Sequence, residues 1–320
     1  MKADPRFTNK PVQFWAYVRS VSEALGYSIR ERKSKGVVTV PASVRNPLIE
    51  DLFFALSKMD QPTDALGSLE NPSHLAIELS SYLSLRAELI NEHIRRDLMT
   101  AEEARTTFLE VQRELNAVPT GIPVLNSKRE ECAVDYKVAG QTVRVPMNKQ
   151  KGVKRFESYL TGIINLVVAD ALQGLPCDYD PRSITRFDHE DTLYQTFSRR
   201  QDGAFPSTRN PISIWEIKEY YYTTTFGSKI SDAVYITSLD GYEREELERV
   251  TKIKINHLVM VDSYETWWGK GRSYLCRMID ILHMGHVDEI LFGREVVTAL
   301  PEIAREWAAE FEARKMWSTD

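Results

Sequence analysis

The segment that most constrains the fold is Pro211–Tyr221, which reads PISIWEIKEYY. Side chains alternate between the two faces of a strand, so Ile214, Glu216 and Lys218 share one face. Trp215 belongs to the other face. Because both faces begin apolar, we predict a central strand that is covered on each side. The charges at its end either mark the exit of the strand into solvent or need partners, since a buried unpaired charge costs roughly several kcal/mol.

The rest of the C-terminal half alternates helical and strand patterns. Helices are predicted over 154–172, about 228–238, 272–283 and 300–317. Strands are predicted near 192–198, 202–206, 211–221, 256–262 and 287–292. Helices that interleave with apolar strands indicate an α/β (α+β) fold in which helices flank a mixed central sheet.

The N-terminal part has a different pattern, which divides the chain into three regions. Apolar residues at helical spacing, including the segment 43–58, predict a mainly helical lobe over 1–120. A turn-rich stretch and an alternating pattern over 121–148 predict a linker and a β-hairpin. The mixed sheet then occupies 149–320, and the lobe is a candidate for DNA recognition or dimerisation.

Composition narrows the class of protein. The chain has 320 residues, 42% hydrophobic and 27% charged, as in ordinary folded domains. No apolar run has the roughly 18 to 20 residues that a membrane span needs, and the N-terminal sequence lacks the apolar core of a signal peptide. The three cysteines lie far apart, which argues against a disulfide framework. We therefore expect a cytoplasmic protein that does not contact a membrane.

Acidic residues are predicted to converge on the charged end of the central strand. Asp202 lies 14 residues before Glu216, a spacing that allows two adjacent antiparallel strands to bring them together. Glu157 shares the apolar face of the helix predicted over 154–172 and is expected to point toward the same sheet. Asp202, Glu216 and the Ile217 carbonyl would hold Mg²⁺, and Glu157 would hold a second ion. Lys218 would position or help to deprotonate the attacking water and would stabilise charge on phosphate oxygens.

This constellation resembles the PD-(D/E)XK nuclease superfamily, whose best-known members are type II restriction endonucleases. A helix Glu, then an Asp, then ExK on the next strand correspond here to Glu157, Asp202, Glu216 and Lys218. The resemblance covers about residues 150–295 and implies a restriction-endonuclease-like core, Mg²⁺-dependent cleavage of DNA and a homodimer. The sequence departs from the motif because Gln201, not proline, precedes Asp202.

Two aspartates are alternatives for the first acidic ligand. Asp188 and Asp191 both lie in the segment RFDHEDTLY, shortly before Asp202. Either would supply the same carboxylate chemistry if the chain brought it to the sheet edge, so the choice among the three stays open at this point.

Two basic segments are candidates for contact with double-stranded DNA, although the formal net charge of the chain is −5. Positive side chains would hold phosphates there, but a solvated surface is an equally good interpretation of the first segment. The residues are Arg30, Arg32, Lys33 and Lys35 in the first segment and Lys151, Lys154 and Arg155 in the second.

The sequence thus supports a metal-dependent endodeoxyribonuclease, most simply the restriction enzyme of a restriction–modification pair. An alternative is a DNA-binding protein that keeps the scaffold without catalysis. A third is a nuclease of the same fold that works in repair, transposition or phage defence.

Overall fold

The computed structural model describes residues 1–148, 156–189, 192–222 and 227–317. The chain divides into two compact units. The sheet unit consists of Met1–Lys2, Asp97–Thr266 and His286–Asp320. The helical unit consists of Ala3–Arg96 and Trp267–Gly285.

The sheet unit is built around a four-stranded mixed sheet with the strand order β10-β11-β12-β13. β10 and β11 are antiparallel, whereas β11, β12 and β13 are parallel. Its strands are β10 (Gly203–Phe205), β11 (Ser213–Glu219), β12 (Asn256–Asp262) and β13 (Glu289–Phe292). The prediction of a mixed α/β fold is confirmed, and β11 is an internal strand as its two apolar faces predict.

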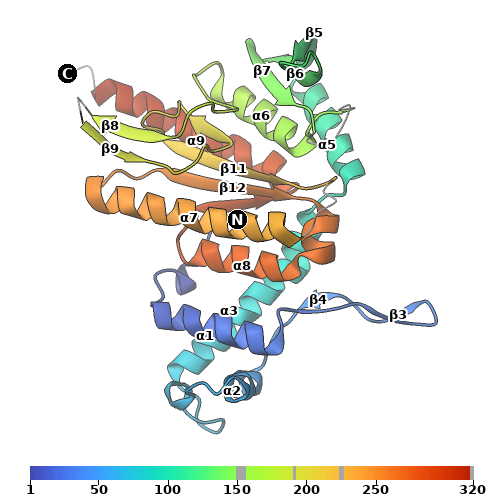
Figure 1. Cartoon of the computed structure of the whole chain (residues 1–320), viewed down its shortest axis with the longest axis vertical. Coiled ribbons are helices and arrows are strands. Elements are labelled where there is room, and N and C mark those ends of the chain that lie inside the picture. The colour runs from blue at the N-terminus through green and yellow to red at the C-terminus, as the bar shows by residue number, and fades with distance from the viewer. Residues whose placement is uncertain (149–155, 190–191, 223–226, 318–320) are drawn as a thin grey trace. The chain divides into compact units, whose positions relative to one another are not determined.

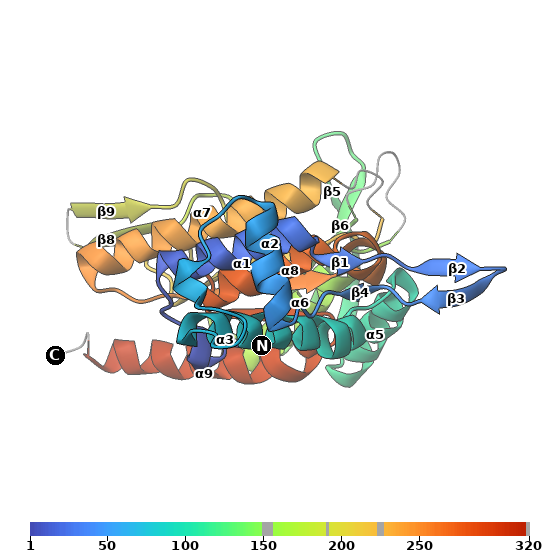
Figure 2. The same cartoon turned by 90° about the horizontal axis from the view of Figure 1, so that it is seen from below.

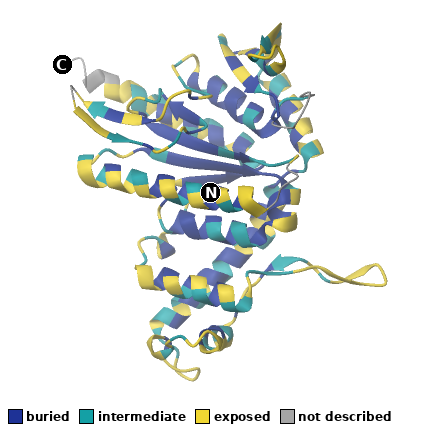
Figure 3. Cartoon of the chain, viewed as in Figure 1, coloured by how far each residue is buried: buried dark blue, intermediate teal, exposed yellow. Residues whose placement is uncertain are grey.

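Helices cover both faces of this sheet (Figures 1 and 3). α6 and α9 lie on one face, where Trp215 of β11 stacks on Trp307 of α9 with ring centroids 5.6 Å apart. α7 lies on the other face, where Leu247 packs with Ile214 of β11. The helices are α6 (Tyr159–Leu172), α7 (Gly227–Thr251) and α9 (Glu295–Trp317). α7 is much longer than the helix predicted at about 228–238.

The remaining elements of the sheet unit precede and follow α6. A three-stranded antiparallel sheet has the order β5-β6-β7, and β8 pairs with β9 in a separate two-stranded sheet. The elements are α5 (Ala101–Glu114), β5 (Val118–Leu125), β6 (Glu131–Val138), β7 (Gln141–Pro146), β8 (Arg186–His189) and β9 (Thr192–Thr196). The hairpin predicted over 121–148 is present as β6 and β7.

The boundary between the two units differs from the predicted one at residue 120. Phe108 of α5 and Tyr136 of β6 are buried in the same core as α6, so these elements belong to the sheet unit. The turn-rich stretch around residue 120 is therefore strand β5 within the sheet unit, and the boundary moves to Asp97. The change of composition marked a turn-rich strand, not a linker between cores.

The helical unit has its own core. Phe14 and Trp15 of α1 pack against Tyr82 of α3, with which each forms an edge-to-face contact. Its elements are α1 (Val12–Leu25), β1 (Ser28–Ile29), β2 (Arg32–Ser34), β3 (Val37–Val40), β4 (Ser43–Val44), α2 (Ile49–Lys58), α3 (His74–Glu88), a π-helix (Leu89–Ile94) and α8 (Arg272–His283). Throughout the described residues of both units, no helix has the length and apolar character needed to cross a membrane.

Candidate active site

Four charged side chains form a network beside β11, which we call the charged network. Lys218 Nζ lies 2.9 Å from Glu216 Oε2, and Arg199 Nη1 lies 2.6 Å from Glu216 Oε1. Arg199 Nε also donates to Asp240 Oδ1 of α7 at 3.0 Å. Glu216 and Lys218 are only 2% and 6% exposed. The charges that end the face begun by Ile214 therefore stay inside the protein and are paired there.

Ion pairing decides the charge state of this network. Burial alone would raise the pKa of Glu216, but Lys218 and Arg199 outweigh burial and lower it. Burial alone would lower the pKa of Lys218, but chiefly Glu216 raises it. Asp240 differs, because burial raises its pKa to about 6 in spite of Arg199. Near neutral pH, Glu216 is therefore a carboxylate and Lys218 an ammonium group.

Asp202 lies next to Glu216, immediately before the neighbouring strand β10. Gly203 of β10 pairs with Trp215 of β11, so the preceding residue, Asp202, is placed beside Glu216. Its carboxylate Oδ2 accepts the Ile217 N–H at 2.8 Å. The structure thus brings Asp202, Glu216 and Lys218 together around one strand end, with Ile217 between them.

Close strand packing holds Asp202 in this position. A Cβ atom at Gly203 would lie 1.9 Å from the Trp215 ring, so only glycine lets β10 approach β11 at this point. The Asp202 N–H also donates to the Trp215 carbonyl at 3.1 Å. The register of β10 against β11, and with it the position of the Asp202 backbone beside Glu216, is therefore fixed.

Glu157 is not where the sequence analysis predicts it. α6 begins at Tyr159, and Glu157 precedes it in an isolated bridge with Met147. Its Oε1 accepts the Tyr136 hydroxyl at 2.9 Å. Tyr136 belongs to the core on the α6 side of the sheet, whereas Glu216 faces α7. The expected helical position is wrong because the bridge to Met147 keeps this residue extended, and its carboxylate is on the other side of the sheet from the network.

Two carboxylates remain for a metal ion, and their chemistry fits Mg²⁺. This ion prefers oxygen ligands and keeps several waters when one or two carboxylates hold it, so Asp202 and Glu216 are of the ligand type that it takes. Over the described part of the chain, no group of three or more His, Cys, Asp or Glu side chains is arranged to hold a metal. Both Glu216 oxygens are already paired with cations, so a divalent ion would compete with Arg199 for Oε1.

Two family models match the chain. The family described as Domain of unknown function (DUF7687) matches residues 99–307, and the one described as Domain of unknown function (DUF7690) matches residues 1–93. The chain belongs to the DUF7687 family. Among curated proteins and among solved structures, no match was found. The DUF7687 match contains Asp202 and the whole charged network, so the function has to be inferred from this site.

Two residues of the charged network, Arg199 and Asp240, were not predicted from the sequence. A signal for Asp240 existed, because Ile230, Ala233 and Thr237 precede it at helical spacing and are all buried. A carboxyl group on such a buried face needs hydrogen-bond or charged partners inside the protein. Arg199 gives no comparable signal, because it lies outside the described strands and reaches Glu216 only through the tertiary fold.

The other predicted site residues lie elsewhere or outside the described residues. Asp188 of β8 forms ion pairs with Arg209 and Arg186 in the separate two-stranded sheet. This geometry favours Asp202 over Asp188 as the partner of Glu216. Arg30, Arg32, Lys33 and Lys35 are exposed in the helical unit. Outside the described residues lie Asp191, Lys151, Lys154 and Arg155.

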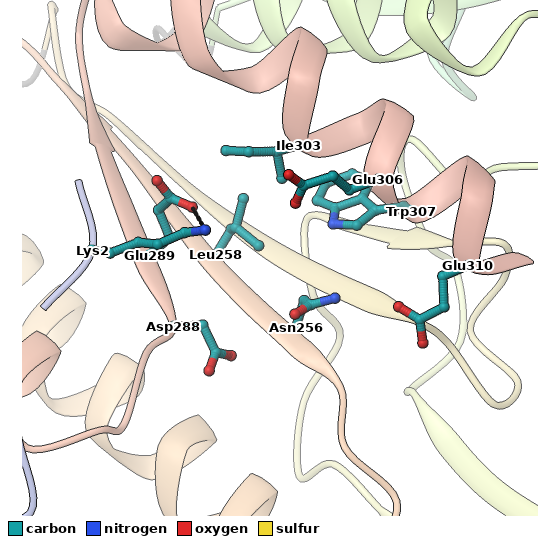
Figure 4. A pocket seen from close by; sticks show the side chains of 9 residues that line it. All are labelled: Lys2, Asn256, Leu258, Asp288, Glu289, Ile303, Glu306, Trp307 and Glu310. Atoms are coloured by element: carbon teal, nitrogen blue, oxygen red, sulfur yellow. Dashed lines mark ion pairs between the residues drawn. The ribbon is translucent and has the colours of Figure 1, made fainter.

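A cavity of about 240 Å³ lies at the opposite end of the DUF7687 sheet (Figure 4). Asn256 and Glu289, which line it, begin β12 and β13, whereas Lys218 is near the end of β11. Acidic side chains that include Glu306 and Glu310 surround Trp307 there. A cavity with this charge repels phosphates, so it is a poor place for a nucleic-acid backbone.

Proposed function

We propose that the protein is a Mg²⁺-dependent DNA endonuclease with a PD-(D/E)XK-type centre formed by Asp202, Glu216 and Lys218. The observation that carries the proposal is the pairing of Glu216 with Lys218 on β11, with Asp202 beside them just before β10. A mixed sheet with helices on both faces supports a restriction-endonuclease-like core. A type II restriction enzyme is the form of this activity that we favour.

The residues divide the chemistry between them. Asp202 and Glu216 would hold Mg²⁺, which when bound supplies Lewis-acid activation of the phosphate and of a water. The raised pKa of Lys218 keeps its ammonium group charged. Lys218 is therefore unsuited to remove a proton and instead stabilises negative charge on the phosphate oxygens. Glu157 has no part in this proposal, because it is bonded to Tyr136 on the other side of the sheet.

Arg199 has a defined place in the same proposal. It pairs with Glu216 and with Asp240, so it can release Glu216 and keep a carboxylate partner. Its guanidinium thereby stabilises the ionised form of Glu216 before a metal binds. When a metal replaces it at Glu216, the guanidinium keeps Asp240 as a partner and is not left as an unpaired buried charge.

A second function is favoured by the closure of the charged network. Two cations and two carboxylates already balance one another, and both Glu216 oxygens are paired. A protein that binds DNA on this scaffold without cutting it would use the same network to hold β11 and α7 together. A nuclease of the same fold in repair, transposition or phage defence would have the first chemistry with another substrate geometry.

Cleavage of DNA by purified variants tests the proposal. We expect the wild-type protein to cut a genome of known sequence in Mg²⁺ and not in chelator. Glu216→Ala and Lys218→Ala should still bind DNA but cut at least about a thousandfold more slowly. Asp262→Asn is a matched control, because Asp262 is a buried carboxylate on β12 outside the network and should keep cleavage.

The products separate the alternatives. Discrete fragments favour a restriction enzyme, structure-dependent nicks favour the repair-type nuclease, and binding without cleavage favours the inactive scaffold. Undiminished cleavage by both alanine variants would remove the assignment.

Cutting both strands of a duplex needs two such centres, so we also propose a homodimer, which sedimentation of the purified protein tests. We propose a cytoplasmic location for this homodimer.

A further inference from the structure

The helical unit carries a long two-stranded arm, residues 28–44. β1 pairs with β4 at its base, and β2 pairs with β3 toward its tip. Lys35 and Gly36 form the turn with φ values of 50° and 82°, the conformation of a tight hairpin turn. Figures 1 and 2 show this ribbon extending away from α1, α2 and α3.

The base of the arm is fixed to the helical unit. Asn91 of the π-helix binds both backbone groups of Val44: its Oδ1 accepts the Val44 N–H at 2.7 Å, and its Nδ2 donates to the Val44 carbonyl at 3.0 Å. Val44 is only 2% exposed. The Arg45 N–H also donates to the Tyr27 carbonyl at 3.1 Å. The arm is therefore aimed by its base and does not hang from a loose linker.

The outer part of the arm buries nothing. All ten residues from 30 to 39 are exposed. Val37 is 68% exposed and Val38 46%, although both are β-branched apolar residues. A two-stranded hairpin with no face packed on a core is marginal by itself. The ribbon therefore adds little to the stability of the fold, and its exposed surface is available to a binding partner.

The charge of the ribbon selects the kind of partner. Between residues 30 and 35 there are four basic side chains and one acidic side chain, Glu31, in a chain whose net charge is −5. The β5–β6 hairpin is a contrast, because Lys128 and Arg129 at its turn are followed by Glu130 and Glu131. Local positive charge on the arm favours a polyanion.

We propose that the β2–β3 ribbon enters the major groove of duplex DNA. This rests on the proposed function for the identity of the substrate. The major groove is about 12 Å wide and admits a two-stranded ribbon. One face of the ribbon presents Lys33 with Val38, and the other presents Ser34 with Val37. Basic side chains contact the phosphates on either side, while the valine methyls reach base edges such as the thymine methyl.

A matched pair of double variants tests the arm. Arg32→Gln/Lys35→Gln removes one arginine and one lysine from it, and Lys128→Gln/Arg129→Gln removes the same from the β5–β6 turn. Lys35 and Arg129 have similar positive φ values, 50° and 60°, so the backbone demands match. Binding to a fluorescent duplex is measured by anisotropy in Ca²⁺ over a range of salt.

The arm variant should bind at least about tenfold more weakly near 0.1 M salt, with a salt dependence smaller by about two counterions. The control should bind like wild type. A duplex whose pyrimidines carry bulky 5-substituents fills the major groove, and it should bind wild type more weakly than plain duplex. Equal binding of the arm variant and wild type, or indifference of wild type to the bulky groups, overturns the inference.

Failure of the two proposals can be told apart. If Glu216→Ala and wild type both bind DNA and neither cuts it, while the arm variant binds weakly, the nuclease assignment fails and the arm stands. If wild type cuts DNA and the arm variant binds and cuts equally well, the arm fails and the nuclease stands. If the arm variant no longer has the mass of a dimer but binds DNA as wild type does, the proposal that the ribbon enters the major groove is overturned. The arm would then be a contact between copies of the chain.

Discussion

Two buried carboxylates on neighbouring strands have opposite charge preferences. Glu216 of β11 is paired with Lys218 and Arg199, and its pKa is lowered in spite of burial. Asp262 of β12 is fully buried too, but burial raises its pKa to about 7. Its partners are the backbone N–H groups of Met99 and Ser263, each at 2.7 Å, and the Tyr221 hydroxyl.

Both groups are buried, so the difference between these two pKa shifts follows from their partners. Neutral donors hold Asp262 in place but do not outweigh desolvation, whereas two cations do so at Glu216. Of the two, Glu216 is held as an anion by its two cations, and Asp262 fastens the backbone before α5 to the end of β12. The two sites can be tested against each other.

The largest effect on stability is expected at Lys218. Lys218→Met leaves Glu216 and Asp240 to share Arg199, so one buried negative charge has no counterpart. Breaking such a pair lowers the free energy of unfolding by about 3 to 5 kcal/mol. Because protonation of a carboxylate relieves the excess charge, the loss should be greater at pH 8 than at pH 5. Urea unfolding at the two pH values measures this loss.

Lys254→Met is the control for this substitution. Lys254 is 82% exposed and forms a surface pair with Glu248 at 3.3 Å. Exposed pairs of this kind are screened by water, so little change is expected. If Lys218→Met were as harmless as the control, the charged network would not hold β11 and α7 together, and the contrast with Asp262 would lose its basis.

Asp262 should show the opposite dependence on pH. Its carboxyl group is neutral in both the folded and the unfolded state only well below its ordinary pKa of 3.8. Between pH 3.8, the ordinary pKa of this group, and about pH 7, its pKa in the folded protein, Asp262 ionises in the unfolded chain but keeps its proton in the folded protein, so stability falls. The full shift in pKa corresponds to a loss of roughly 4 kcal/mol in the free energy of unfolding. Asp262→Asn cannot ionise, so over this interval it should lose about 2 to 4 kcal/mol less than wild type.

Unfolding free energies of wild type and Asp262→Asn from pH 4 to 8 measure the difference. The asparagine oxygen can still accept the Met99 and Ser263 N–H groups, and its amide can face Tyr221. A constant difference between the two proteins across the range would show that Asp262 is ionised in the folded protein, as Glu216 is.

The contrast also marks how far the sequence could take the prediction. Alternation along PISIWEIKEYY places Glu216 and Lys218 on one face of an internal strand, because period two is a local property of any strand. Adjacent-strand spacing brings Asp202 to Glu216, and the Gly203 contact with Trp215 completes it. Local pattern sufficed where neighbouring segments pair directly.

Other features depended on tertiary structure. Glu157 shared a helical spacing with α6 residues, but the bridge to Met147 keeps it extended, so the helix begins only at Tyr159. The length of α7 was missed because its second half is polar, and pairs such as Arg249 with Glu246 support a solvated helix without apolar periodicity. Arg199 contacts Glu216 and Asp240 only after β10, β11 and α7 assemble, so no local sequence pattern predicts its place in the charged network.

The smallest expected effect is at Tyr221, and it sharpens the comparison most. The Tyr221 hydroxyl donates to Asp262 Oδ2 and opposes the rise in pKa that burial causes. Tyr221→Phe should therefore raise that pKa further and lower the free energy of unfolding by about 1 kcal/mol above pH 7. The loss should shrink below pH 5, where the carboxyl group is protonated.

In the Asp262→Asn background, the effect of Tyr221→Phe on the free energy of unfolding should have little dependence on pH, because no charge forms. A double-mutant cycle at pH 5 and pH 8 tests this, since equal losses in all four measurements would mean that Tyr221 acts through packing alone.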